Sequence, residues 1–545
     1  METGQAVLWF MKKDGCRKVP STHPLEHHPA YCGQNLLDTQ DKSRLYLFIY
    51  CWNQHDLNIF VEVIYYMITS VDYYNRLKSR KPTLYMFGEK VDVPVDHPQL
   101  KTNFNAVAVS YDMALKPEYE DLMTVVSPIT GKRVNRYNHP YMSADDLLKK
   151  VDMIRTMVSQ TGCPCVCRCV GSDALSTIGI TSYDVDKALG TNYYQRYLEY
   201  LKYFQENDLT ASGAVTDAKG DRSLRPHQQP DPDLYVHVVD KREDGIIVRG
   251  AKTSITNAAI CDEIVVIPGR GLTEKDAAYA VAFAIPADTK GIVQIATAKS
   301  PRLGLKMEGP IARRYAFSDS IIIFEDVFVP WERVFLCGEW QFGAGMGSLF
   351  GNFHRLSHCG CIPGRGDMLT GATSLIAKYN GIRDKGHVRS KLVDLITSAE
   401  TVYACGITAA VKGVRTPSGL YQPATIYSNT GKLIESENTT AMITPVADIC
   451  GGLLTTMPSE ADYFSEATHQ YMKKYLKGAS NLEAEDRIKA IHLVADLTVT
   501  RHAAGGTVAE VMGAGSPEAQ RRAIHDDYDF EKREKVAKML ANIGD

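Results

Sequence analysis

The chain has 545 residues, with 61 Lys and Arg against 64 Asp and Glu, and a formal net charge of -3 at pH 7. A chain of this length buries a sizeable core, and we expect about two to four domains. Because the charges nearly balance, there is no global field for nucleic acid or for an anionic membrane surface. We therefore expect a small-molecule partner, with no nucleic acid and no membrane.

The cysteine content indicates a reducing compartment. Thirteen cysteines are scattered along the chain, without a convincing signal peptide before them. Secreted disulfide frameworks are typical of short chains with evenly spaced cysteines, so we expect a cytoplasmic protein. The apolar runs LYLFIYCW and IFVEVIYYMI are separated by NQHDLN, and each is far shorter than the span of about 20 residues that a bilayer requires.

The first ordered region is predicted to begin at Met67, since the preceding residues show neither a helical nor a strand period. MITSVDYYNRLKS is predicted to be a helix with Ser70 as its cap. SADDLLKKVDMIRTMVSQTG is predicted to be an amphipathic helix capped by Ser143. The first lobe, residues 67–208, is therefore predicted to be helical.

Between residues 209 and 345 the period of the apolar residues shortens towards two, which is typical of strands. LYVHVVDKREDGIIVRGAK is predicted to form a hairpin that turns at Asp244 and Gly245, and DEIVVIP, AYAVAFAIPA and SIIIFEDVFVP to form further strands. Long helical patterns return over residues 346–545. Helix, sheet and helix in separate blocks favour an α+β fold over an alternating βαβ chain. The chain has no GxGxxG or Walker loop, so a Rossmann or P-loop site has no support.

Two stretches concentrate possible metal ligands. In TGCPCVCRCVGSD the cysteines fall on alternate positions, Cys163, Cys165, Cys167 and Cys169. An extended segment would point them to two faces, whereas a helix would place the first with the third and the second with the fourth. Soft thiolates suit zinc or iron–sulfur centres, but buried thiols that pack as small apolar side chains also fit this spacing. The second stretch, FHRLSHCGC, offers His354, His358, Cys359 and Cys361.

Several longer stretches make the chain recognisable: YMFGEKV, RCVGSDAL, YLKYFQENDLTASGAVTDAKGDRS, DPDLYVHVVDKREDGIIVRGAK, GGLLTTMPSEAD and GAGSPEAQ. Through them, residues 67–545 resemble the 4-hydroxybutyryl-CoA dehydratase branch of the flavoprotein family of 4-hydroxyphenylacetate 3-hydroxylase. The resemblance implies an acyl-CoA dehydrogenase-like α+β fold. Its parts would be a helical N-terminal domain over 67–208, a central β domain over 209–345 and a C-terminal helical bundle over 346–545. Residues 1–66 would be an atypical extension or lie upstream of the true start.

The resemblance also implies a [4Fe-4S] cluster held by three cysteines and one histidine. Matching the motifs RCVG and HR to the family's pattern assigns the four ligand positions. Cys163, Cys167 and Cys359 then become packing residues. The implied ligands are Cys165, Cys169, His354 and Cys361.

FAD is the second cofactor that the resemblance implies, bound between the β domain and the helical domains. Glycines let the backbone approach a ligand, while hydroxyl groups and Arg222 can satisfy flavin heteroatoms and phosphate. On its own residues, VTDAKGDR fits a surface loop equally well. The implied FAD residues are Val215, Thr216, Asp217, Lys219, Asp221, Arg222, Ser254, Thr256, Gly451, Gly452, Met457 and Pro458.

The implied activity is radical dehydration of 4-hydroxybutyryl-CoA, or a related hydroxyacyl-CoA, to crotonyl-CoA, with vinylacetyl-CoA isomerase activity. The C3 hydrogen of such a substrate is not activated by the carbonyl, so ordinary acid–base catalysis cannot remove it, and flavin with a Lewis-acidic iron is required. His354 would be ligand and base, Thr256 would bond the flavin, and Asp319 and Glu510 would complete the catalytic set. For Glu510 a solvated helix carboxylate is the alternative. A homotetramer is implied as well.

Four positions depart from the dehydratase pattern. His358 replaces a tyrosine, Ile362 a lysine, Asp319 a glutamate and Cys167 a glutamine. The cofactors are therefore better supported than the substrate. The alternatives are a metal-free, FADH2-dependent aromatic 3-monooxygenase and a paralogue that binds cofactors without turnover.

Overall fold

The structure of the chain is a computed structural model. It describes residues 67–163, 165, 168–299, 304–479 and 482–543, and the backbone of two antiparallel strands, β1 (Tyr31–Gln34) and β2 (Leu47–Tyr50). The interpretation of residues 1–66 as an extension and the assignment of Cys167 as a packing residue lie outside the described residues.

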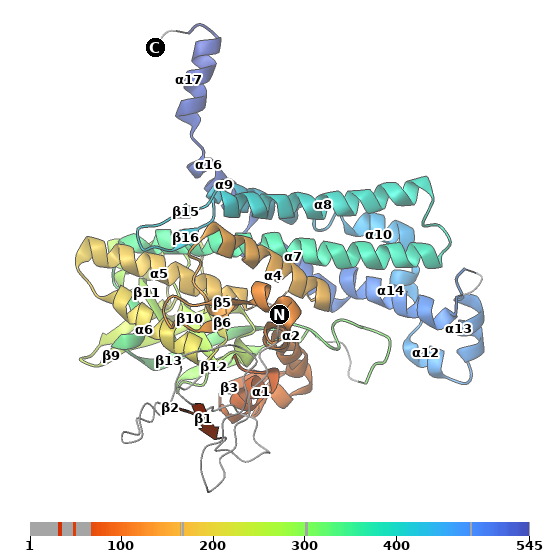
Figure 1. Cartoon of the computed structure of the whole chain (residues 1–545), viewed down its shortest axis with the longest axis horizontal. Helices are drawn as coiled ribbons and strands as arrows, with labels where there is room; N and C mark the ends of the chain where they lie inside the picture. Colours follow the sequence, from red (N-terminus) through yellow and green to blue (C-terminus); the bar gives the residue numbers. More distant parts are fainter. Residues whose placement is uncertain are drawn as a thin grey trace.

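Long helices form one layer, and two β-sheets lie beside it (Figure 1). The central helix of this layer has 37 residues and packs against the three others. The four helices are α4 (Ala144–Thr161), α5 (Cys169–Leu189), α7 (Gly343–Tyr379) and α8 (Gly386–Val411).

The caps of two early helices follow from local sequence. Ser143 caps α4 as predicted, since its Oγ accepts a hydrogen bond of 3.1 Å from the Asp146 backbone N–H. The prediction that Ser70 caps the first helix was wrong. Thr69 is the cap, because its extended backbone lets it share a reciprocal capping box with Asp72. Helix α1 therefore spans Ser70–Ser79.

The region 67–208 is not wholly helical. The short strand β3 (Thr83–Met86) lies parallel to β12 (Ile292–Ala296) and extends the larger sheet, whose edge would otherwise expose unpaired backbone groups. The other elements of this region are β4 (Glu89–Lys90), α2 (Pro98–Ala114), α3 (Glu120–Met123), β5 (Thr124–Val126), β6 (Arg133–Asn135) and α6 (Tyr193–Glu206). The domain boundaries at residues 208 and 345 stay predictions.

The central region forms two sheets. The larger has the order β4-β3-β12-β13-β9-β8 and the smaller β14-β11-β10-β7. The predicted hairpin is confirmed, because β8 and β9 pair antiparallel and Arg242 N donates to Gly245 O at 2.8 Å across the turn. The strands are β7 (Ala211–Ala214), β8 (His237–Lys241), β9 (Gly245–Thr256), β10 (Glu263–Val266), β11 (Val281–Pro286), β13 (Asp319–Pro330) and β14 (Val334–Cys337).

The C-terminal region adds further helices to the layer, and its last helix stands away from the rest of the molecule (Figure 1). A two-stranded ribbon joins α8 to the next helix. The elements are β15 (Val414–Arg415), β16 (Tyr421–Gln422), α9 (Thr425–Asn438), α10 (Ile443–Cys450), α11 (Leu453–Thr456), α12 (Glu460–Phe464), α13 (His469–Tyr475), α14 (Ala484–Thr498), α15 (Arg501–Met512), α16 (Pro517–Asp527) and α17 (Phe530–Leu540).

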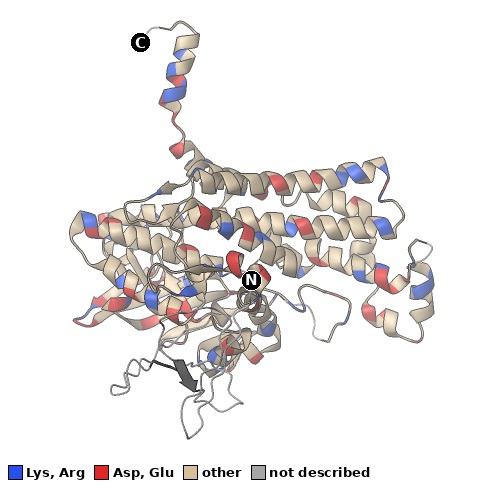
Figure 2. Ribbon diagram, viewed as in Figure 1, with Lys and Arg blue, Asp and Glu red and all other residues tan. Residues whose placement is uncertain are grey.

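No helix in the described ranges is long and apolar enough to cross a membrane. Lys and Arg are interspersed with Asp and Glu along the helices and strands (Figure 2). This mixture agrees with the small net charge of -3.

Two glycines of α7 allow α4 to approach closely. A Cβ atom at Gly360 would lie 2.6 Å from the Val151 carbonyl oxygen, and one at Gly364 would lie 2.7 Å from the Arg155 carbonyl oxygen. Atoms this close overlap, so only glycine permits this spacing of the two helices. The close approach positions the part of α7 that carries the His and Cys residues against α4.

Gly360→Ala is expected to lower the free energy of unfolding by about 1–3 kcal/mol, because the new methyl group must displace the backbone of α4. Gly371→Ala is the matched control, since this glycine lies in the same helix with nothing within 4 Å of the added Cβ. Helix propensity should make that change stabilising by up to about 1 kcal/mol. Urea unfolding of both variants tests the contrast, and equal losses would contradict it.

Candidate metal and flavin site

Helices α5 and α7 bring three possible metal-binding side chains together. The ligand atoms of Cys169, Asp173 and His354 lie within 4.8 Å of one another. Cys169 is the first residue of α5, and Asp173 lies one turn later on the same side of the helix. The structure therefore juxtaposes two predicted ligands, Cys169 and His354, and adds an aspartate that was not predicted.

Asp173 is fully buried and bonds four donors, one of which is Tyr141 Oη at 3.5 Å from Oδ1. Its Oδ1 accepts from Lys150 Nζ at 2.5 Å, and its Oδ2 accepts from Ser357 Oγ at 2.8 Å. The same Oδ2 lies 2.9 Å from His354 Nδ1. A carboxylate that holds one ring nitrogen orients a metal-binding imidazole and leaves the other nitrogen for the metal. The residues present therefore fit a metal centre with His354 as a ligand through Nε2.

The charges around His354 oppose the effect of burial. Burial disfavours the imidazolium, but hydrogen bonds to Asp173 and Cys169 outweigh it and raise the pKa of His354 to about 9. Burial likewise disfavours the Asp173 carboxylate, yet Lys150 and His354 hold the pKa of that carboxyl below its usual range. A ligand imidazole must be neutral, so metal binding at this centre would release the proton of His354.

The other cysteines divide between two sides of α7. Cys163, Cys169 and Cys361 belong to one buried cluster, and Cys165 packs against it. Cys359 belongs to a different cluster, beside α8 and α9. Cys163 and Cys165 are not helical, so the helical pairing of the cysteine run does not form at these positions. Cys165 and Cys361 thus share the hydrophobic surroundings of Cys169, but neither joins the group of close ligand atoms formed by Cys169, Asp173 and His354. Cys359 lies in the other cluster.

The ends of two strands approach Cys165 from the sheet. Thr256 Oγ1 donates to Asp319 Oδ1 at 2.8 Å, and Asn257 Nδ2 donates to the Cys165 carbonyl oxygen at 3.4 Å. Burial raises the pKa of the Cys165 thiol, and Asp319 adds to the rise. The predicted residues Thr256 and Asp319 are therefore neighbours beside a predicted ligand.

Lys299 is a charged residue of this site that the sequence did not reveal. It forms an ion pair with Asp319, and its ammonium lies 3.5 Å from the centre of the Phe317 ring. Asp319, which is one methylene shorter than the glutamate of the dehydratase pattern, and Lys299 thus neutralise each other's charge next to Cys165. No motif marks this lysine, because its partner lies twenty positions further along the chain.

Glu510 points into the protein from α15. It is only 4% exposed, so the alternative of a solvated helix carboxylate was wrong. Its carboxylate forms an ion pair with Arg365 of α7, and Lys432 of α9 bonds its backbone carbonyl oxygen. Glu510 is therefore buried, with its carboxylate paired to a cation of α7 and its backbone bonded by a cation of α9.

Two departures from the dehydratase pattern lie on α7 next to the ligand positions. The ring of His358 meets the ring of His354 edge to face, with 5.2 Å between the centroids. Ile362 packs with Cys359 on the other side of α7. The histidine therefore borders the proposed metal centre, and the isoleucine does not share its cluster.

The predicted FAD residues fall into two groups. The first group includes a segment that lies along β9 and consists of Val215, Thr216 and Asp217. Two hydrogen bonds hold it there: Thr253 N donates to Thr216 O at 2.7 Å, and Lys252 Nζ donates to Val215 O at 3.0 Å. The rest of this group is half-buried or exposed, and comprises Lys219, Asp221, Arg222, Ser254 and Thr256. Lys219 is half-buried and Arg222 is exposed, so solvent or a ligand can reach both cations.

The second group of predicted FAD residues follows α10. Gly451, Gly452 and Pro458 are exposed, and Met457 packs against residues near α12 and α14. Gly451 has a φ of 73° and open space around its Cα, so a ligand can approach its backbone. Among the described residues no hydrogen bond joins this group to the first.

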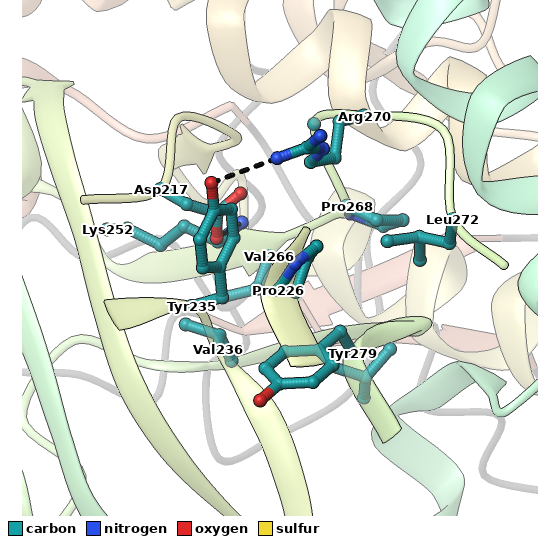
Figure 3. Close-up of a pocket in the computed structure, with 12 residues that line it drawn as sticks. Asp217, Pro226, Tyr235, Val236, Lys252, Val266, Pro268, Arg270, Leu272 and Tyr279 are labelled. Atoms are coloured by element: carbon teal, nitrogen blue, oxygen red, sulfur yellow. Dashed lines mark hydrogen bonds and ion pairs between the residues drawn. The ribbon is translucent and has the colours of Figure 1, made fainter. Parts of the chain in front are cut away.

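A small cavity lies beside the first FAD group (Figure 3). It measures about 10 Å³, which is room for about one water molecule and not for a flavin. Asp217 on its wall is tied to Lys252 Nζ at 2.7 Å, and Arg270 donates to Tyr235 Oη at 3.1 Å. This cavity is therefore too small for the cofactor, and its lining mixes apolar side chains with the charged residues Asp217, Lys252 and Arg270.

Comparison with known proteins defines the class of this fold and site. The family described as 4-hydroxyphenylacetate 3-hydroxylase N terminal matches residues 69–336, and 4-hydroxyphenylacetate 3-hydroxylase C terminal matches residues 344–542. The chain belongs to the 4-hydroxyphenylacetate 3-hydroxylase family.

Within this family the chain is 38% identical to the 4-hydroxybutyryl-CoA dehydratase/vinylacetyl-CoA-Delta-isomerase of Clostridium aminobutyricum, over 88% of this chain and 100% of the relative. A solved oxygen-tolerant archaeal 4-hydroxybutyryl-CoA dehydratase from N. maritimus superposes with a TM-score of 0.85 at 36% identity, covering 88% of this chain and 96% of that one. A mutant of HpaB complexed with FAD gives a TM-score of 0.78 at 25% identity, covering 87% and 98%.

Proposed function

We propose that this chain is a hydro-lyase of the 4-hydroxybutyryl-CoA dehydratase type, which forms crotonyl-CoA from 4-hydroxybutyryl-CoA or a related hydroxyacyl-CoA. Vinylacetyl-CoA isomerase activity belongs to the proposal. The observation that carries it is the juxtaposition of Cys169 and His354, with Asp173 behind the imidazole. The identities of 36% and 38% to two dehydratases support the substrate class.

The proposed cofactors are a [4Fe-4S] cluster and FAD. Cys165, Cys169, His354 and Cys361 would hold the cluster, and the two groups around β9 and after α10 would hold FAD. When bound, these groups would supply a Lewis-acidic iron and one-electron chemistry. Relatives of this family have been solved with FAD, which supports the flavin part of the proposal.

The protein's own residues would orient the ligands and move protons. Asp173 holds His354 through Nδ1, and Lys150 balances the charge of Asp173. Glu510, held by Arg365, would take up or return a proton. Thr256 and Asp319, joined by a hydrogen bond of 2.8 Å, would face the flavin beside Cys165.

We propose a homotetramer, an acyl-CoA dehydrogenase-like arrangement of the domains and a cytoplasmic location as further parts of this assignment. Helix α17 supports the oligomer: none of its residues is buried, and Met539 and Leu540 are 67% and 75% exposed. An isolated helix of this length is marginal in water, so a contact with another subunit would stabilise it.

A metal-free aromatic 3-monooxygenase is the competing function. It has support in the 27% identity to the 4-hydroxyphenylacetate 3-monooxygenase oxygenase component of Thermus thermophilus. A metal-free mechanism gives no purpose to the pairing of Cys169 with His354, and the identity is lower than to the dehydratase.

Anaerobic purification followed by an assay tests the proposal. The protein is expected to be brown, with about four iron and four sulfide per chain, and to convert 4-hydroxybutyryl-CoA to crotonyl-CoA. An iron-free protein that hydroxylates a phenol with added FADH2 and O2 would establish the competing function instead. Iron and FAD without turnover of the CoA ester would identify a non-catalytic paralogue.

A further inference from the structure

The loop between β12 and β13, described over residues 304–318, approaches the cysteine run. Its residue Ile311 lies against Gly162, which ends α4 directly before Cys163. A Cβ atom at Gly162 would lie 2.7 Å from Cδ1 of Ile311. Ile311 also belongs to the buried cluster that contains Cys163 and Cys169. The loop therefore borders the point at which the chain leaves α4 towards the predicted ligands.

A carboxylate of α14 holds this part of the loop. Oδ2 of Asp496 accepts hydrogen bonds from the backbone N–H groups of Ile311 and Ala312, both at 2.8 Å. Oδ1 of Asp496 accepts from Thr500 Oγ1 at 3.0 Å. Asp496 is buried, and hydrogen bonds to a charged acceptor are stronger than those between neutral groups. Asp496 therefore fixes the backbone at Ile311 from another part of the chain.

A second carboxylate holds the loop at an earlier position. Glu460 of α12 accepts from three successive backbone N–H groups, those of Lys306, Met307 and Glu308, at 2.7, 2.6 and 2.8 Å. In return, the Glu460 N–H donates to Glu308 Oε1 at 2.7 Å. Met307 belongs to a different buried cluster from Ile311, formed with residues of α12, α13 and α14. The two carboxylates thus hold the same loop at places that face different clusters.

The far end of the loop reaches the candidate site. Ala316 N donates to the Thr102 carbonyl oxygen at 3.2 Å. The next residue, Phe317, packs in the cluster of Ile311, and the Lys299 ammonium lies 3.5 Å from the centre of the Phe317 ring. The loop therefore places two apolar side chains in the wall of the site, Ile311 at the cysteine run and Phe317 at Lys299.

Contacts from other parts of the chain determine where the cysteine run lies, because Cys163 and Cys165 are not in a helix or strand. Gly162 has a φ of 72°, so its backbone is left-handed, and its missing side chain leaves the place that Ile311 fills. From the end of β9, Asn257 Nδ2 donates to the Cys165 carbonyl oxygen at 3.4 Å. The run is thus held from the loop at Ile311 and from the sheet at Asn257.

We propose that Asp496 is a positioning residue for the cysteine run. By bonding the N–H groups of Ile311 and Ala312, Asp496 holds Ile311 against Gly162 and so fixes the course of the chain from α4 to Cys165. A functional site requires its supporting residues to hold the binding side chains within about 0.5 Å. Loss of the Asp496 carboxylate should therefore loosen the run while the rest of the fold persists. Only the consequence for metal binding rests on the proposed function.

Amide hydrogen exchange of the full-length protein, measured by mass spectrometry as purified and after iron is removed with a chelator, tests the positioning. The comparison after iron removal is decisive, since lost metal cannot then cause a difference. Asp496→Ala is expected to speed exchange by about 10–100-fold in peptides covering residues 308–313 and residues 158–165, because the loop loses bonds to a charged group and releases Ile311. Asp496→Asn keeps a neutral acceptor and should restore most of the protection. Unchanged exchange at residues 158–165 in Asp496→Ala would overturn the inference.

Ile311→Ala separates the two steps of the inference. It leaves the backbone bonds to Asp496 in place but removes the side chain that meets Gly162. Exchange at residues 158–165 should therefore rise as in Asp496→Ala, without a rise at residues 308–313, and an unchanged rate at 158–165 would refute the contact. Iron affinity should fall about 10–100-fold in both alanine variants and stay near wild type in Asp496→Asn.

The matched controls are Glu460→Ala and Glu460→Gln, since Glu460 bonds the same loop through a similar set of N–H groups. We expect Glu460→Ala to speed exchange at residues 306–308 and to leave iron affinity unchanged. Equal losses of iron affinity in Glu460→Ala and Asp496→Ala would mean that the carboxylates only stabilise the loop, which contradicts positioning. A wild type that binds no iron would contradict the proposed function, whereas the exchange data still decide the role of Asp496.

Discussion

Cys169→Ala and Cys361→Ala are each expected to leave less than about one iron per chain where about four are expected in the wild type, while Cys359→Ala keeps its iron. The reason is the geometry of α7. Two positions along a helix turn the side chain by about 200°, so Cys359 and Cys361 cannot both face α5. Cys361 shares a buried cluster with Cys169, whereas a Cβ atom at Gly431 of α9 would lie 2.7 Å from Cys359 Sγ.

The same measurement covers the cysteine run between α4 and α5. We expect Cys165→Ala to lose iron and Cys163→Ala to retain it, although both lie near Cys169. Iron and acid-labile sulfide per chain, together with the visible absorption of the anaerobic protein, give the result. Equal loss in all five variants would mean that the assignment of ligands is wrong, whereas loss on Cys359→Ala alone would place the cluster on the α9 side.

Elements set by neighbouring residues were predictable from the sequence. The cap at Ser143 and the hairpin from β8 to β9 depend on residues within a few positions of one another. The strand β3 was missed, because its four residues show no strand signal until β12, some two hundred positions away, pairs with them. The Ser70 cap failed by one residue, since Thr69 and Ser70 are chemically alike and only the backbone conformation separates them.

The candidate site was predictable only where a resemblance supplied the residues. The groups that orient those residues come from other helices, so no spacing marks them: Lys150 reaches Asp173 from α4, and Glu435 reaches His358 from α9. Asp173 could have been recognised from its spacing, because a residue four positions after Cys169 lies on the same side of a helix. This inference requires knowing that α5 begins at Cys169.

Of the contacts at this site, the ion pair between Lys150 and Asp173 is expected to cost the most stability when only one of its partners is removed. Both side chains are 0% exposed, and Lys150 Nζ also bonds the Phe353 carbonyl oxygen at 3.0 Å. Lys150→Met should lower the free energy of unfolding by about 3–5 kcal/mol, because it leaves a buried carboxylate without its ammonium. Adding Asp173→Asn should recover most of this loss. Urea unfolding of the wild type, the two single variants and the double variant gives the interaction free energy between the two side chains.

Stability and metal binding should part in the double variant. The neutral amide that Asp173→Asn introduces cannot supply the charge that holds His354, so iron affinity should stay about 10–100-fold below wild type even where stability returns.

In the metal-free wild type the pKa of His354 is raised to about 9 from an unfolded value of about 6.5. The contribution of His354 to stability is therefore complete below about pH 6.5 and is lost as the pH rises through about 9. Asp173→Asn should reduce this fall in the free energy of unfolding, which urea unfolding at pH 6 and pH 9.5 measures. An unchanged decline would mean that Asp173 does not set the charge of His354.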